Sequence, residues 1–294
     1  MRHDAKIAKA QEKNRSLCAP LHTFLILGYI LIYPALRNCF LSLWKWKLTS
    51  ADERVFVGLE NYIRILTNDS TFTTVIGFTF RFAFISLAVE MVLGLLIALL
   101  LNQEIHGRSL IASLYIMPYS MASIAVGLCW RLMWAEDYGL INYLVGLFGF
   151  DRVTWLVEAP ALCVIVPEVW RSVPFVTLTL LAGLTSIPND LYEAARVDGS
   201  NVWHRFRYIT LPLLTPSLTI ALVFETIFKL RVFDLIFTLT GGGPGTQTLP
   251  LGVYIYRSFF RYMDGGYASA LSVILLVIGT LISLVYIKLF YRDV

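Results

Sequence analysis

Charged side chains occur within otherwise apolar stretches, and their spacing allows them to pair. Glu168 and Arg171 are three residues apart, and Glu225 and Lys229 are four apart, so each pair can neutralise its charges on one helix face. Glu90 has no close sequence neighbour of opposite charge and is expected to pair across helices. Because a charge at the bilayer centre costs about 3 kcal/mol on insertion scales, such groups face a partner, a bundle interior or a water-filled cavity.

Residue types that catalyse reactions or bind metals are scattered along the chain. The four cysteines and four histidines are dispersed without CxxC or HExxH spacing, so no zinc site can be assembled from them. GGGPGT at 241–246 has glycines like those of a phosphate-binding loop but lacks the lysine that must follow them, and we interpret it as a turn. We therefore expect no catalytic residue, metal site or cofactor in this chain.

The composition indicates an integral membrane protein. Of 294 residues, 57% are hydrophobic and 15% are charged, whereas soluble domains contain about 25% charged residues. The mean hydropathy is +0.68. The net charge of +4 comes from scattered basic residues, which excludes the basic stripe of a nucleic-acid-binding protein.

Six stretches have the length of about 20 residues that a helix needs to cross the hydrocarbon core. The predicted fold is all-α, with a tail at 1–16 and one six-span domain at 17–290. The spans are expected at 17–36, 82–101, 109–130, 159–184, 211–239 and 267–287, of which the fourth and fifth carry charges. The first stretch is too long for a signal peptide and is interpreted as a retained anchor.

Basic residues indicate the orientation. Lys and Arg are more frequent in 1–16, 102–108, 185–210 and 288–294 than in the loops on the other side. Since Lys and Arg concentrate in cytoplasmic loops, this bias places both termini and the loop at 185–210 in the cytoplasm.

That polar loop has the pattern of two short helices. Asp190 and Glu193 have the spacing of a capping box, and Gly199 supplies a break, since glycine adopts positive φ without steric cost. Ser200 is expected to cap a second helix, which places three apolar residues on one face. These are Val202, Phe206 and Ile209.

The loop resembles the EAA loop of binding-protein-dependent ABC importer permeases. The residues that match its pattern are Glu193, Ala194, Ala195, Asp198, Gly199, Ile209, Leu211 and Pro212. FVGLENY at 56–62, LLIALLLN at 95–102 and FDLIFTLTGGGPG at 233–245 look like the carbohydrate-uptake branch of these permeases. The TGGGP stretch is similar to the first permease of sugar transporters that use two different permeases.

The resemblance implies a subunit of an ATP-driven importer in the bacterial inner membrane. Its EAA loop would dock as a coupling helix in a groove of a separate ATPase subunit, and the spans would switch by alternating access. The implied partners are a second permease, two ATPase subunits that bind ATP and Mg²⁺, an external solute-binding protein and the lipid bilayer. The external segments 42–72 and 237–265 would be among the surfaces that receive the binding protein.

The implied cargo is a carbohydrate or related polyol, and two roles are open for the intramembrane residues. They either pair to orient spans four and five, or they line a polar path that has an aromatic platform. The candidates are Glu90, Tyr119, Trp130, Glu168, Trp170, Arg171, Glu225, Lys229 and Asp234.

Two other classes of protein are alternatives. An ion-coupled secondary transporter would use Glu90, Glu168 and Glu225 as proton sites, but it leaves the EAA pattern unexplained. An integral membrane enzyme that transfers sugars would need paired carboxylates, a nucleophile or a metal motif in its extramembrane loops, where the sequence has none.

Overall fold

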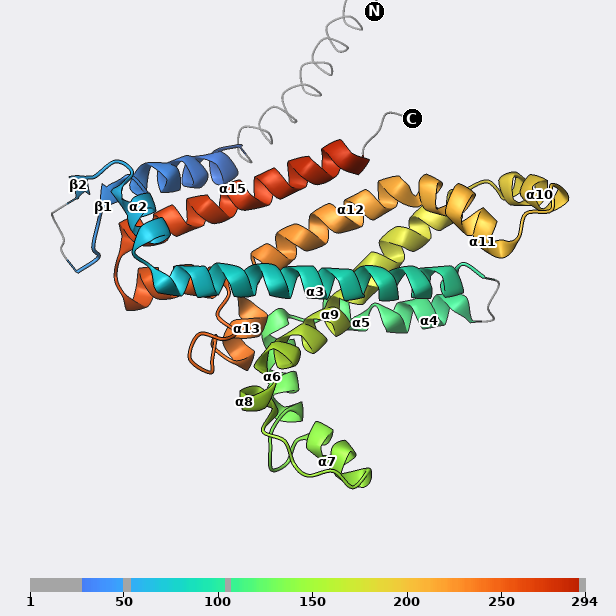
Figure 1. Cartoon of the computed structure of the whole chain (residues 1–294), viewed down its shortest axis with the longest axis horizontal. Helices are drawn as coiled ribbons and strands as arrows, with labels where there is room; N and C mark the ends of the chain where they lie inside the picture. The colour runs from blue at the N-terminus through green and yellow to red at the C-terminus, as the bar shows by residue number, and fades with distance from the viewer. Residues whose placement is uncertain (1–27, 50–53, 104–106, 291–294) are drawn as a thin grey trace, which may run out of the picture. The chain divides into compact units, whose positions relative to one another are not determined.

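The protein is almost entirely helical in a computed structural model that describes residues 28–49, 54–103 and 107–290 (Figure 1). A helix at 28–41 comes first in the described chain. The two short strands are β1 (Trp44–Lys45) and β2 (Val55–Phe56). The labelled helices are α2 (Glu60–Thr67), α3 (Ser70–Leu101), α4 (Arg108–Tyr115), α5 (Met117–Ser120), α6 (Ser123–Met133), α7 (Leu140–Leu147), α8 (Trp155–Glu158), α9 (Pro160–Thr185), α10 (Asn189–Val197), α11 (Val202–Arg205), η1 (Phe206–Thr210), α12 (Leu211–Leu230), α13 (Asp234–Leu239), α14 (Leu251–Tyr256), η2 (Arg257–Arg261) and α15 (Gly265–Phe290).

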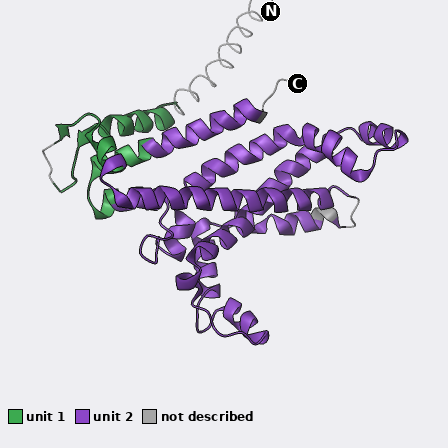
Figure 2. Ribbon diagram, viewed as in Figure 1, with its two compact units in different colours: residues 1–65, 258–273 green, residues 66–257, 274–294 purple. Residues whose placement is uncertain are grey.

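The chain divides into two compact units (Figure 2). In the unit of residues up to 65 and 258–273, β1 and β2 form an antiparallel pair with Trp44 opposite Phe56. The side-chain amide of Asn61 is buried there and donates to the carbonyl oxygens of Ser42 and Trp44, at 2.9 and 3.1 Å. These bonds hold the turn that precedes β1 against the start of α2.

The unit of residues 66–257 and 274–294 is built on α3, α9 and α12. α3 begins at a cap in which the Asp69 carboxylate accepts from the backbone N–H groups of Thr71 and Phe72, which satisfies two of the helix's free donors. The helices approach closely where a glycine faces a neighbour: a Cβ on Gly94 of α3 would lie 2.5 Å from Val176 Cγ1 of α9. Small residues permit such backbone approach between membrane helices.

Two apolar cores flank this contact. One combines residues of α3, α9 and α12, including Ala98, Val176, Leu180 and Leu214. The other lies where α3 and α9 meet the segment around α6 and α13, and includes Phe78, Phe82, Val164 and Ile236. The three long helices of this unit are therefore packed along much of their length.

Among the described residues, four helical stretches are long and apolar enough to cross a membrane: Ser70–Leu101, Pro160–Thr185, Val202–Leu230 and Gly265–Leu289. A fifth is a pair of helices, Leu110–Ser120 and Ser123–Met133, that meet at 91°. The multi-pass helical fold is confirmed for the described residues. The predicted count of six rests in part on 17–27, which lies outside the described residues, while 28–41 is helical.

The predicted span at 109–130 is not one continuous helix, because the chain bends between α5 and α6. Pro118 has no N–H to continue the helical ladder, and the next residue, Tyr119, bonds to the carbonyl of Ile116, three residues back. Met121 and Ala122 then adopt extended backbone, with ψ of 142° and 132°. The helical direction thus changes at these two extended residues, just after the turn that contains Pro118.

The observed helix also differs from the predicted span at 211–239 at both ends. The helix begins at Val202 and passes through the π-helical turn η1, so that Pro212 lies inside a longer helix. It ends at Leu230, and residues 231–233 separate it from α13. The backbone of this break packs closely on α14, since a Cβ on Gly252 would lie 2.8 Å from the Val232 carbonyl oxygen.

We predict that Gly94→Ala lowers the free energy of unfolding by about 1–3 kcal/mol, because overpacking a tight contact forces neighbours to shift. The matched control is Gly77→Ala on the same helix, where a Cβ would have no atom within 4 Å and alanine favours the helix. Denaturant unfolding of the purified protein in detergent measures both. Equal effects of the two substitutions would contradict the close α3–α9 packing.

Candidate functional site

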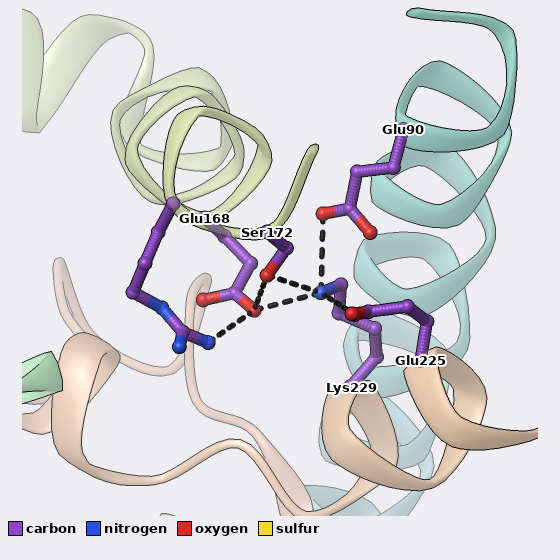
Figure 3. A network of polar contacts seen from close by, with 6 residues as sticks. Glu90, Glu168, Ser172, Glu225 and Lys229 are labelled. Carbon is purple, nitrogen blue, oxygen red and sulfur yellow. Dashed lines mark hydrogen bonds and ion pairs between the residues drawn. The ribbon is translucent and has the colours of Figure 1, made fainter. Parts of the chain in front are cut away.

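One buried ammonium group binds three carboxylates from three helices (Figure 3). Lys229 Nζ of α12 lies 2.7 Å from Glu225 Oε2 of the same helix and 2.8 Å from Glu168 Oε1 of α9. It also lies 3.1 Å from Glu90 Oε1 of α3. Lys229 and Glu90 have no exposed surface, and the other two carboxylates are about as buried. We call this set, with Arg171 and Ser172, the ion cluster.

The three protons of the ammonium group are fully used. Lys229 donates to Glu168, to Glu225 and, at 3.0 Å, to the hydroxyl oxygen of Ser172. Glu90 therefore has an ion pair with Lys229 but no hydrogen bond from it, and within the described chain both its carboxylate oxygens are buried without a hydrogen-bond donor. Among the carboxylates of the ion cluster, Glu90 is the least satisfied.

Glu168 accepts the most hydrogen bonds of the three carboxylates, all at one oxygen, while its Oε2 is buried without a donor among the described residues. Its Oε1 accepts from Lys229, from Arg171 at 3.0 Å and from the Ser172 hydroxyl at 3.2 Å. Arg171 and Ser172 follow Glu168 by three and four residues, so one turn of α9 supplies all three groups. Two cations face three carboxylates in the ion cluster, and the formal sum is one negative charge.

The helices themselves position the ammonium group. Lys229 lies in the last turn of α12, where the carbonyl end of the helix dipole favours a cation. Glu90 lies within α3 and Glu168 within α9. The apolar packing of these helices against α12 therefore places both carboxylates next to Lys229. Breaking one partner of such a buried set leaves the remaining charge uncompensated.

The structure thus brings together five of the nine candidate intramembrane residues. Both predicted local pairs are present, and the expected partner of Glu90 across helices is Lys229. Tyr119 stacks on Phe175 of α9 with ring centroids 5.4 Å apart.

The other candidates lie elsewhere. Trp130 meets Trp170 edge-on at 5.9 Å, which joins α6 to α9 by an aromatic contact, and Trp170 is 42% exposed. Asp234 is exposed in the first turn of α13, outside the ion cluster.

A second feature is the hairpin formed by α10 and α11. α10 ends in a motif in which the N–H of Gly199 bonds to the Arg196 carbonyl and that of Ser200 bonds to the Ala195 carbonyl. Gly199 has φ of +77°, the left-handed conformation that this type of helix end requires. The predicted break at Gly199 is therefore observed.

Two predicted caps of this hairpin are wrong. Asn201, not Ser200, caps α11, since its side chain accepts from the His204 N–H at 2.7 Å. The backbone of Ser200 still belongs to the end of α10, which moves the cap by one residue. Asp190 lies in the first turn of α10 without capping it, where its charge favours the helix dipole.

The second predicted short helix is not separate. α11 continues through η1 into α12, and the N–H of Leu211 bonds to the Phe206 carbonyl five residues back. The hydroxyls of Tyr192 and Thr210 lie 3.0 Å apart and join α10 to η1. The hairpin is thus attached to a helix of 29 residues, Val202–Leu230.

Much of the hairpin's apolar surface is uncovered. Val197, Val202 and Trp203 are 88%, 74% and 70% exposed, and Glu193 and Ala194 are exposed beside them. Val202 therefore lacks the cover that Phe206 and Ile209 have, although the three were predicted to share a face. Large apolar side chains exposed together indicate a surface for another molecule.

Sequence reasoning missed several residues that the structure makes important. Ser172 could have been found from its spacing of four residues after Glu168, and the apolar residues Val197 and Trp203 from their place in a polar loop. Gly94 gives no local signal, because what makes it necessary is a neighbour on another helix.

Comparisons with known proteins give one family. Residues 90–292 match the model described as binding-protein-dependent transport system inner membrane component. The chain is 39% identical over 282 residues to the trehalose/maltose transport system permease protein MalF of Thermococcus litoralis, covering 93% of this chain and 92% of that protein.

Solved structures show the same fold. A chain of a bacterial ABC transporter involved in the import of the acidic polysaccharide alginate matches with a TM-score of 0.81 and 23% identity, covering 98% of this chain and 99% of that one. The alginate transporter in complex with its alginate pentasaccharide-bound periplasmic protein matches with a TM-score of 0.80 and 23% identity, covering 95% and 94%.

We predict that Lys229→Met lowers the free energy of unfolding by about 3–5 kcal/mol, because it leaves three buried carboxylates without their common cation. Glu90→Gln should cost much less, since it removes excess negative charge and loses no hydrogen bond. Denaturant unfolding in detergent measures both, with Lys288→Met, at an exposed position of α15, as the control. An effect of Lys229→Met no larger than that of Lys288→Met would contradict the assigned contacts.

Proposed function

The chain belongs to the family of binding-protein-dependent transport system inner membrane components, and we propose that this ABC importer permease forms part of the translocation path for a carbohydrate or related polyol. The trehalose/maltose permease at 39% identity supports that cargo class. The family membership does not favour an ion-coupled secondary transporter or a sugar-transferring enzyme.

The observation that carries the coupling proposal is the exposed hairpin. It presents Glu193, Ala194 and Ala195 on α10, followed by Asp198 and Gly199 at the bend. Alanines keep this helix narrow for docking into a groove, and Glu193 supplies a charge for registry. In our proposal the groove belongs to an ATPase subunit, which binds ATP and Mg²⁺ in place of this chain.

The connection to α12 allows a movement of the hairpin to be transmitted along the helix. Ile209, Leu211 and Pro212, which complete the EAA pattern, lie in η1 and the start of α12. The helix from Val202 continues without a break to Leu230, about 40 Å at 1.5 Å per residue. A displacement of the docked hairpin therefore reaches Lys229, where α3 and α9 are tied to α12.

We assign the ion cluster the role of holding these three helices in register during alternating access. The burial of its lysine and three carboxylates supports pairing over direct contact with cargo in this conformation. The polar path for cargo would then be lined by residues outside the buried ion cluster. Tyr119, Trp130 and Trp170 are the proposed aromatic platform. Trp170 supports this best because much of its surface is exposed.

The proposed assembly contains a second permease, two ATPase subunits and an external solute-binding protein. The alginate transporter was solved with its periplasmic protein, which supports a binding protein as the donor of cargo here. Both termini and the hairpin lie in the cytoplasm in this proposal, and 42–72 and 237–265 are external. The glycine-rich stretch at 241–245 adopts a turn with positive φ at Gly241, Gly242 and Gly245, as predicted.

We predict that Gly199→Pro abolishes uptake while the protein still inserts in the membrane. Proline cannot adopt φ of +77° and lacks the N–H that bonds to Arg196. Gly199→Asn is the matched control, because asparagine tolerates the left-handed conformation better than other residues with a side chain. Vesicle uptake, with membrane content checked by immunoblot, separates coupling from insertion. Normal uptake by Gly199→Pro would refute the coupling assignment.

The energy source tests the function itself. In proteoliposomes containing the complete transporter and its binding protein, uptake of a radiolabelled neutral disaccharide should require internal ATP and should persist when a protonophore collapses the proton gradient. An ATPase subunit without hydrolytic activity should stop uptake. Uptake driven by a proton gradient without ATP would contradict the proposal.

A further inference from the structure

The short helix α7 has an apolar stripe that no part of the described chain covers. Leu140, Tyr143, Leu144 and Leu147 recur at spacings of three, one and three residues, which places them on one helix face. Their exposed fractions are 49%, 66%, 44% and 64%. We call these four residues the α7 stripe.

The opposite side of α7 is fastened to its own loop by a single buried amide. Asn142 donates to the carbonyl oxygens of Glu136 and Val153, and its oxygen accepts from the Val153 N–H and the Trp155 indole N–H. These four bonds lie between 2.8 and 3.2 Å. The loop is thus a built structure that fixes the outward orientation of the α7 stripe.

The path of the chain runs across the spanning direction. α6 leaves the preceding helix at 91°, and in the view of Figure 1 the segment of α6, α7 and α8 runs crosswise to α3. An eight-residue helix such as α7 is too short to cross the membrane.

Polar and apolar groups are arranged around α7 as at a membrane boundary. The α7 stripe has no charge, and the charges closest in sequence lie beyond both ends, at Glu136, Asp137, Asp151 and Arg152. A hollow of about 630 Å³ next to the helix is lined by Asp137 and Arg152 as well as by Tyr143 and Leu147. Tyrosine and aliphatic residues with charged groups at their edge are typical of segments that lie in the interface plane.

We propose that the α7 stripe is a lipid-docking surface, which lies in the interfacial region of the bilayer and anchors the corner between α6 and α9. The helix that contacts α7 also exposes apolar residues: Leu128 and Leu132 on α6 are 50% and 59% exposed. This inference rests on the membrane location of the family and is independent of the cargo and of the coupling hairpin.

Spin labelling tests the proposal on the assembled transporter. Nitroxide labels are attached at Tyr143→Cys and Leu147→Cys in a chain whose four native cysteines are replaced by alanine. Reconstitution uses vesicles of phosphatidylethanolamine and phosphatidylglycerol. Collision rates are measured with oxygen, which concentrates in lipid, and with a neutral nickel chelate, which stays in water. Asp137→Cys is the matched control, because the Asp137 side chain is 84% exposed in the same loop.

We expect oxygen collisions to exceed nickel collisions severalfold at 143 and 147, and the order to reverse at 137. A nickel-dominated label at 147 would overturn the proposal, since the α7 stripe would then face water and be free for a protein such as the external solute-binding protein. Low rates with both reagents would also overturn it, because a protein subunit would cover the stripe. If Leu147→Cys incorporates poorly, Leu144→Cys reports on the same face. None of these readings depends on transport, so failure here leaves the proposed function intact.

Discussion

The packing of α3, α9 and α12 depends on one buried nitrogen atom, Lys229 Nζ. Apolar contact holds helices together in lipid with little directional preference, because lipid tails are as apolar as the side chains between helices. A buried ammonium group that contacts carboxylates from α3, α9 and α12 supplies that direction. Any slide or rotation of one of these helices must lengthen a charge contact in a low-dielectric surrounding, where such lengthening is expensive.

The sequence predicted the ion pairs within single helices of the ion cluster. It did not predict that these pairs from different helices meet at Lys229. Residues three or four apart on one helix must be neighbours, so the contacts Glu168–Arg171 and Glu225–Lys229 follow from spacing alone. That Lys229 also receives Glu90 and Glu168 depends on how three helices pack. No pattern within a single helix contains that information, and the same holds for the break after Leu230, which forms against Gly252.

Prediction of the hairpin succeeded at the position where only one residue type suits the backbone conformation. Gly199 marked the bend because no residue with a side chain adopts its conformation as cheaply. The capping residue was misplaced because Ser200 and Asn201 are both good caps, and the choice between them was made by the hydrogen bonds that end α10. The uncovered Val197 and Trp203 show the same limit, since their use depends on a molecule outside the chain.

The π-helical turn η1 sets an angular phase between the two ends of one long helix. A normal helix advances 3.6 residues per turn, and a bond from Leu211 to Phe206 accommodates one residue more than the usual ladder. One residue corresponds to about 100° of rotation around a helix axis. The direction in which the hairpin points relative to Lys229 is therefore set by this wide turn. Without it, the docking face of the hairpin would be rotated around the helix axis relative to the ion cluster.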